Sequence, residues 1–285
     1  MTDKSLDILG VKPVAKAIEH ASVTTIDGIS AFFGAICMPA AEEFGLLLKD
    51  RVAHFRQDNL QKIAEKTKRK IEYLKIEPTG DCNPRLIQET IEQASWSDDS
   101  CIQDMWAGLI AAATDTAPAA DDSLIYTETL RRLTPFQARL LNHIYGDPRA
   151  CSVSAGSIPI NSIYTPQNSL SFTGREVLEL YPDDLAKFVN IANTSHEAIL
   201  EDEGSYAIAL GRFRPQIDSL VSLGLLRDAR IVDSGNGLLV LPSLEGLDLY
   251  MRGLGYKIYP LEVFILTQQH WCQLKGVDPH THRRT

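Results

Sequence analysis

The 285-residue chain lacks the marks of a secreted or membrane-spanning protein. Its five cysteines are odd in number and scattered, with no short C-x-x-C spacing that would indicate zinc or a redox pair, so a reducing compartment suits them. The uncharged stretch 28–41 has 14 residues, fewer than the roughly 20 that a helix needs to cross a bilayer. The N-terminus has no basic start followed by an apolar run. We therefore expect a cytoplasmic protein, with peripheral attachment to a membrane left open.

The motifs of common catalytic sites are also missing. The sequence has no Walker loop, no G-x-G-x-x-G after a predicted strand and no G-x-S-x-G elbow. Its seven histidines are dispersed, and none is spaced from a cysteine or a carboxylate as metal ligands are. These absences predict a protein that is not an enzyme and that uses no cofactor and no metal.

The net charge of −9 is unevenly spread along the chain. Residues 1–77 contain 12 Lys and Arg against 11 Asp and Glu, whereas residues 78–285 contain 16 against 26. A nucleic-acid backbone attracts proteins chiefly through Lys and Arg. The acidic C-terminal two thirds is therefore a poor candidate for binding nucleic acid.

The N-terminal region combines an apolar segment with a basic-edged helix. Apolar residues recur at spacings of three and four over residues 42–75, which predicts a long amphipathic helix. Basic residues on one side of that helix border its apolar stripe, an arrangement typical of helices that bind surfaces. The candidate residues for contact with a membrane or a protein partner are Phe32, Phe33, Ile36, Met38, Lys62, Lys66, Arg69 and Lys70.

Two interpretations of these residues are open. The segment 28–41 and the helix can pack together as a helical hairpin turned at Pro39, with the phenylalanines in a core. Alternatively, the apolar side chains can insert into a lipid interface, where full burial of each contributes roughly 1.5 to 3 kcal/mol. Four basic residues near an anionic membrane add at most about 4 kcal/mol, so charge alone does not attach the chain.

The middle of the chain predicts several further helices. Helical stretches cover "PRLIQETIEQASW" and "SCIQDMWAGLIAAAT", joined at "SDD", where Ser97 or Asp98 is expected to cap the second helix. Trp96 and Trp106 fall on one apolar face, which indicates a place in the core rather than a ligand role. Two more helices follow in "SLIYTETLRRL" and "TPFQARLLNHIY". Residues 146–174, rich in Ser, Pro and Asn, predict a long surface excursion, either functional or disordered.

The C-terminal region has the pattern of a winged helix. After a stretch predicted as a broken pair of helices, a helix ending in "DSLVSLGLL" leads to a predicted β-hairpin, "RDARIV" and "LLVLP", and then to a short helix, "SLEGLDLYMRG". Winged helices often bind DNA. The basic residues available for that alternative role are Arg212, Arg214, Arg227 and Arg230. Because Asp218, Asp228 and Asp233 lie among them, a protein-contact or packing module is the favoured interpretation.

Three segments resemble a known family. They are "AAEEFGLLLKDRVAHFRQDNLQKIAEKTKRKI", "SWSDDSCIQDMWAGLIAAAT" and "DSLVSLGLL", and together they are similar to the bacterial abortive-infection alpha (Abi-alpha) family, also catalogued as a domain of unknown function. The resemblance implies a role in defence against phage and implies no established catalytic residues. The chain departs from the family pattern in the excursion at 146–174 and in "CIQDM", where a more leucine-rich run is typical.

The sequence thus predicts a mainly α-helical protein with a small β-hairpin. The expected regions are an N-terminal helical region at 1–77, with the apolar segment 28–41 and the amphipathic helix 42–75, a helical pair at 78–120, a winged-helix-like domain at 121–275 and a polar tail at 276–285. The expected function is non-enzymatic anti-phage defence through contact with a second protein of the same defence system, a phage component or an anionic membrane surface. The alternative is a winged-helix DNA-binding regulator.

Overall fold

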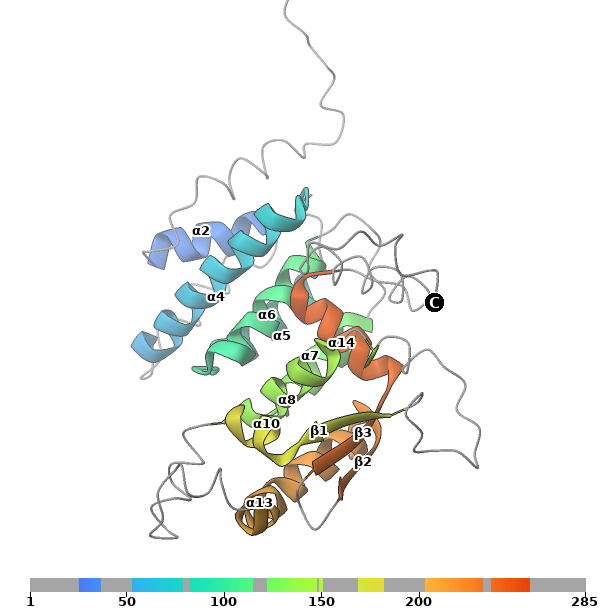
Figure 1. Cartoon of the computed structure of the whole chain (residues 1–285). Helices are drawn as coiled ribbons and strands as arrows, with labels where there is room; N and C mark the ends of the chain where they lie inside the picture. The colour runs from blue at the N-terminus through green and yellow to red at the C-terminus, as the bar shows by residue number, and fades with distance from the viewer. Residues whose placement is uncertain are drawn as a thin grey trace, which may run out of the picture. The chain divides into compact units, whose positions relative to one another are not determined.

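The computed structural model describes residues 26–36, 53–78, 83–114, 122–147, 149–150, 169–181, 203–232 and 237–256 (Figure 1). The described residues are mainly helical with one small antiparallel sheet, as predicted. The chain forms two compact units, Met1–Leu133 with Met251–Lys257, and Thr134–Tyr250 with Ile258–Thr285. The predicted regions 1–77 and 78–120 both fall in the first unit, and the predicted region 121–275 is divided between the two.

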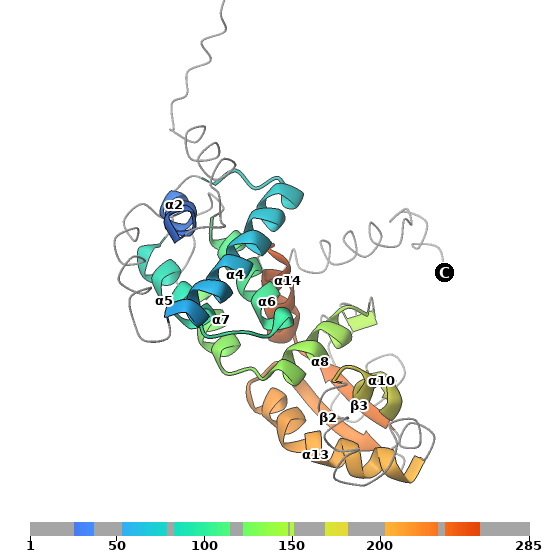
Figure 2. The same ribbon diagram turned by 90° about the vertical axis from the view of Figure 1, so that its left-hand side faces the viewer.

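The first unit is built around one apolar helix. Its helices are α2 (Ile26–Ile36), α4 (Ala53–Leu74), α5 (Pro84–Ala94), α6 (Ser100–Ala113) and α7 (Asp122–Arg131). In Figure 2, α4, α5 and α7 surround α6, and each of them contacts it. Because "MWAGLIAAA" is apolar on all sides, every residue of α6 from Met105 onward is buried. The described part of α4 confirms the predicted amphipathic helix over residues 53–74, and residues 42–52 lie outside the described part of the chain.

The cap of α6 differs from the prediction. Its N-cap is Asp99, whose carboxylate accepts hydrogen bonds from the backbone N–H groups of Cys101 and Ile102. Neither Ser97 nor Asp98 has this role, since the Ser97 hydroxyl accepts a hydrogen bond from a tryptophan further along the helix. Several capping residue types in a row leave the choice to tertiary contacts.

A glycine allows a close backbone approach within this unit. A Cβ atom added at Gly108 of α6 would lie 1.8 Å from the carbonyl oxygen of Gly253. Gly253 belongs to the last turn of α14 (Leu244–Leu254), and that turn is part of the first unit. The backbones therefore touch at a point where no side chain fits.

The second unit contains the sheet. Its elements are α8 (Pro135–Tyr145), β1 (Leu170–Thr173), α10 (Gly174–Glu179), α13 (Glu203–Ser222), β2 (Leu226–Val232), β3 (Gly237–Pro242) and the first part of α14. The strand order is β1-β3-β2, and both pairings are antiparallel. The predicted hairpin is confirmed in β2 and β3. Residues 233–236, between the two predicted strands, lie outside the described part of the chain, and so do residues 182–202 of the predicted broken helix pair.

The strand β1 corrects the prediction for residues 146–174. Residues 170–173 are not part of a surface excursion but pair with β3, from Leu170 opposite Val240 to Thr173 opposite Gly237. Four residues are too few to give a recognisable alternation, and their pairing partner is far away in sequence. Residues 151–168 of the predicted excursion lie outside the described part of the chain.

A buried tyrosine joins three segments of the second unit. The hydroxyl group of Tyr145, at the end of α8, donates a hydrogen bond to the Leu225 carbonyl oxygen at 2.6 Å and accepts one from the Ser243 N–H at 3.0 Å. Burial raises the pKa of Tyr145 to about 12. The phenol is thus held neutral between the end of α13 and the turn that precedes α14.

Tyr145 predicts a loss of stability in alkali. The phenol ionises near pH 10 in the unfolded chain and near 12 in the folded one, so its contribution is complete below pH 10 and is lost as the pH rises towards 12. We expect the stability advantage of the wild type over Tyr145→Phe, measured by urea unfolding, to shrink by about 1.4 kcal/mol between pH 9 and pH 11. An advantage that stays constant over this range would contradict the assignment.

Candidate functional site

Two of the four apolar residues predicted for membrane or partner contact, Phe32 and Phe33, lie in the core of the first unit. Phe32 and Phe33 in α2 are at most 1% exposed, and their rings meet edge to face with centroids 5.3 Å apart. α2 packs on α4. Ile36 is the last residue of α2, whereas Met38 and the predicted turn at Pro39 lie outside the described residues. The two phenylalanines therefore belong to the core of this structure.

The four basic residues predicted on α4 divide into two pairs. Lys62 and Arg69 are exposed. Lys66 donates hydrogen bonds to the backbone carbonyl and the hydroxyl oxygen of Ser100, the latter at 2.9 Å, and Lys70 pairs with Asp104 at 3.0 Å. Two of the predicted contact residues thus join α4 to α6.

The environment of Lys66 disfavours its charge. Partial burial lowers the pKa of Lys66 below its ordinary value. The charge of Asp104 opposes this shift, while the nearby Arg69 and Lys70 add to it. Lys66 is therefore better described as a helix-joining residue than as a free surface cation.

The turn between α5 and α6 is held by buried amides. Asn59 of α4 donates to the Ser95 carbonyl oxygen at 3.0 Å, and Gln103 of α6 donates to the Ser97 carbonyl oxygen at 2.9 Å. Gln103 also donates to the side-chain oxygen of Asn59 at 3.3 Å. All three helices are linked through this turn. The backbone of this turn is thus held by side chains of α4 and α6.

Trp106 fills the centre of this arrangement. It is 1% exposed, and its indole N–H donates to the Ser97 hydroxyl at 3.0 Å. The prediction of a core position for Trp106 is confirmed. A buried indole requires an acceptor for its N–H group, and Ser97 provides one.

Trp96 occupies a different position from the one predicted. Half of its side-chain surface, 50%, is exposed, so it is not a core residue. The Arg56 guanidinium carbon lies 4.8 Å from the centroid of its ring. Arg56 itself is only 6% exposed and donates through Nε to the Ser95 hydroxyl at 3.0 Å. Trp96 follows the last turn of α5, where helical periodicity no longer predicts direction.

The residues predicted for the alternative DNA-binding role are exposed on α13 and β2. Arg214 lies 3.6 Å from the Asp218 carboxylate, and Arg230 lies 3.3 Å from that of Asp228. Arg212 and Arg227 are also exposed. Arg214 and Arg230 therefore each have an acidic neighbour, as the sequence indicated.

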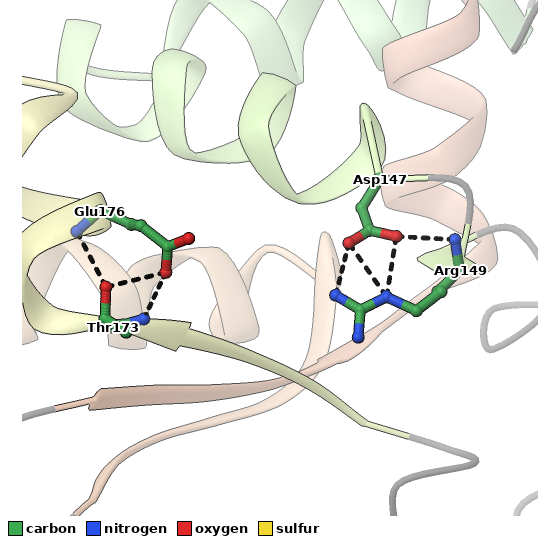
Figure 3. Close-up of polar contacts among 4 residues, drawn as sticks. All are labelled: Asp147, Arg149, Thr173 and Glu176. Atoms are coloured by element: carbon green, nitrogen blue, oxygen red, sulfur yellow. Dashed lines mark hydrogen bonds and ion pairs between the residues drawn. The ribbon is translucent and has the colours of Figure 1, made fainter. Parts of the chain in front are cut away.

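A group of charged residues near the end of α8 was missed by the sequence interpretation (Figure 3). Asp147 binds Arg149 through both carboxylate oxygens, and Thr173 forms a capping box with Glu176 at the start of α10. Burial alone would raise the pKa of Asp147, but the hydrogen bonds from Arg149 lower it overall. The Thr173 N–H lowers the pKa of Glu176.

These acids are occupied by local structure. Asp147 binds the backbone N–H and the guanidinium of Arg149, and Glu176 completes a helix cap. In the part of the chain that the structure describes, no three His, Cys, Asp or Glu residues form a possible metal-binding group. We therefore interpret this group as a structural feature of the second unit.

Comparison with known proteins identifies one family. Residues 55–236, which are 182 of the 285, match the family model described as abortive infection alpha. The matched region begins in α4 and ends between β2 and β3. No match was found among curated proteins or among solved structures. Among the described helices, none is both long and apolar enough to cross a membrane.

The packing of α6 predicts the effect of changes at Trp106. Trp106→Ala should lower the free energy of unfolding by about 3 to 5 kcal/mol, because it leaves a cavity and removes the partner of Ser97. Trp106→Phe keeps most of the volume and should cost less, about 1 to 3 kcal/mol. Chemical denaturation measures both. A Trp106→Ala protein with unchanged stability that loses function would instead place Trp106 in a functional site.

Proposed function

Because the chain belongs to the abortive infection alpha family, we propose that it acts in anti-phage defence as a non-catalytic sensor or effector that works through contact with a protein partner. The observation that carries this proposal is the family match over residues 55–236. The chemistry of the described polar residues is consistent with it. The buried amides and the Lys70–Asp104 pair join helices, and the other ion pairs between described residues link positions at most four apart in the sequence.

The contacts of α4 favour a protein partner over an anionic membrane. With Lys66 and Lys70 bound to α6, the exposed basic residues of the predicted set are Lys62 and Arg69. At about 1 kcal/mol each near an anionic surface, they supply about 2 kcal/mol. Insertion of Phe32 and Phe33 into lipid would require α2 to leave its place on α4. The proposed partner is a second protein of the same defence system or a phage component.

A membrane role remains the second interpretation of the N-terminal region. In that case α2 is packed at rest and is released on infection, because a permanently exposed apolar helix would bind lipid indiscriminately. Once α2 is released, its apolar side chains, including the two rings that are now buried, supply the affinity for lipid. The purified protein should then be indifferent to vesicles.

We further propose that the second unit is a winged helix used as a protein-contact or packing module. The order α8, β1, α10, α13, β2, β3 and the sheet order β1-β3-β2 support this assignment. The competing role is DNA binding through α13 and β2. The acidic neighbours of Arg214 and Arg230 weaken that role, because a phosphate backbone would meet paired cations.

The packing of α2 predicts a folding defect from charge at its buried positions. Phe32→Asp with Phe33→Asp should abolish cooperative unfolding of the first unit, since the lost burial costs about 3 to 5 kcal/mol per ring before any charge is buried. Ala31→Asp, at an exposed position of the same helix, is the matched control and should stay folded. Circular dichroism and vesicle sedimentation measure the outcome. A folded double variant that no longer protects cells would support the release of α2 instead.

The packing interpretation of the second unit predicts little effect from its exposed arginines. Arg212→Ala with Arg214→Ala should leave protection against phage largely intact, and the wild type should show no salt-dependent binding to duplex DNA. Plaque counts and DNA titrations at two salt concentrations test this. Micromolar or tighter binding that weakens steeply at physiological salt would establish the DNA-binding alternative.

A further inference from the structure

Trp96 is a half-exposed aromatic residue whose ring packs against a buried arginine. One face of its ring lies over the Arg56 guanidinium, which is itself buried and bound to Ser95. Half of the side-chain surface is exposed. An indole that is half exposed forgoes about half of the stabilisation that its full burial would give.

The backbone on both sides of Trp96 is fixed. The carbonyl of Ser95 is bound by Asn59 and the carbonyl of Ser97 by Gln103, and both amides are 2% exposed. The Trp96 N–H donates to the Gln93 carbonyl oxygen at 3.2 Å. A side chain held in place before binding loses little conformational entropy when a partner covers it. Tryptophan is also the residue type most enriched among those that dominate binding energy.

A second exposed aromatic residue lies close to the same turn. Phe55, in the first turn of α4, is 43% exposed. It shares a face of α4 with Asn59, four residues later, which binds the Ser95 carbonyl oxygen. Phe55 and Trp96 therefore lie at the same end of the first unit, and both offer apolar surface.

The residues that flank Trp96 in the sequence carry charge of one sign, while the buried Arg56 lies against its ring. Residues 86–130 contain nine Asp and Glu and no Lys, Arg or His. Glu92 and Asp98 are exposed, and no described residue pairs with either carboxylate. They lie four residues before and two residues after Trp96 in the sequence.

We propose that Trp96, Phe55, Glu92 and Asp98 form a docking surface for a protein segment that presents an apolar side chain beside Lys or Arg. This inference rests on the proposed function as a contact protein and names the chemistry of its partner. The aromatic residues supply the contact area, and the carboxylates select a basic segment. An anionic membrane or a nucleic acid is repelled by the same carboxylates, so neither is the occupant.

The direct test uses a synthetic helical peptide of Leu and Lys as the probe, with a Leu and Glu peptide as its counterpart. Fluorescence anisotropy should give at least about tenfold tighter binding of the basic peptide to the full chain. Trp96→Ala, and separately Glu92→Lys with Asp98→Lys, should weaken that binding at least about tenfold without a change in melting temperature. Tyr73→Ala, at a 65% exposed aromatic residue at the far end of α4, is the matched control and should bind as the wild type does.

Three results would overturn the proposal. They are no preference of the wild type for the basic peptide, equal binding by Trp96→Ala and the wild type, and Trp96-dependent binding to anionic vesicles. If Trp96→Ala lowers the melting temperature, its weaker binding is not evidence for the docking surface. The peptide affinity of the Glu92→Lys, Asp98→Lys variant is then the test, because that variant changes only exposed side chains. A wild type that binds the peptide but protects cells against no phage would refute the proposed function and leave the docking surface standing.

Discussion

The enclosure of α6 is the constraint on which the first unit depends. Because α6 is apolar on every side from Met105 onward, α4, α5 and α7 must cover it, and the chain enters it through a turn whose backbone carbonyl groups are bound by side chains of α4 and α6. Those side chains are Asn59 and Gln103, which bind Ser95 and Ser97. The amides thereby fix the turn, and the turn fixes the direction of Trp96. The same hydrogen bonds from Asn59 and Gln103 therefore stabilise the core and fix the position of the Trp96 ring.

In the second unit, one hydroxyl group satisfies buried backbone groups from two distant segments. Tyr145 binds backbone groups at Leu225 and Ser243, which are about 80 and 98 residues away in sequence. Gly246 leaves room for it, because a Cβ atom there would lie 2.2 Å from the phenol oxygen. Both units therefore use a few buried polar contacts to specify which segments of the chain meet, while apolar burial supplies most of the stabilisation.

The sequence was sufficient wherever the signal is local. Three elements were predictable because their patterns involve residues that are close in the sequence. They are the amphipathic helix at 53–74, the apolar helix that begins at Ser100, and the hairpin of β2 and β3. The pairing of β1 with β3 was not predictable, since four residues acquire their strand geometry from a partner about 70 residues away. For the same reason the sequence could not separate Lys66 and Lys70, which bind α6, from Lys62 and Arg69, which are exposed.

The central claim is that α2 is a core helix of the first unit and that an anionic membrane alone does not release it. Hydrogen exchange of the full chain, with and without anionic vesicles, tests it most directly. If α2 stays packed on α4, the amides of residues 26–36 should exchange at the same slow rate in both samples. Faster exchange in that helix on addition of vesicles would contradict the account, because it would mean that lipid draws α2 out of the core.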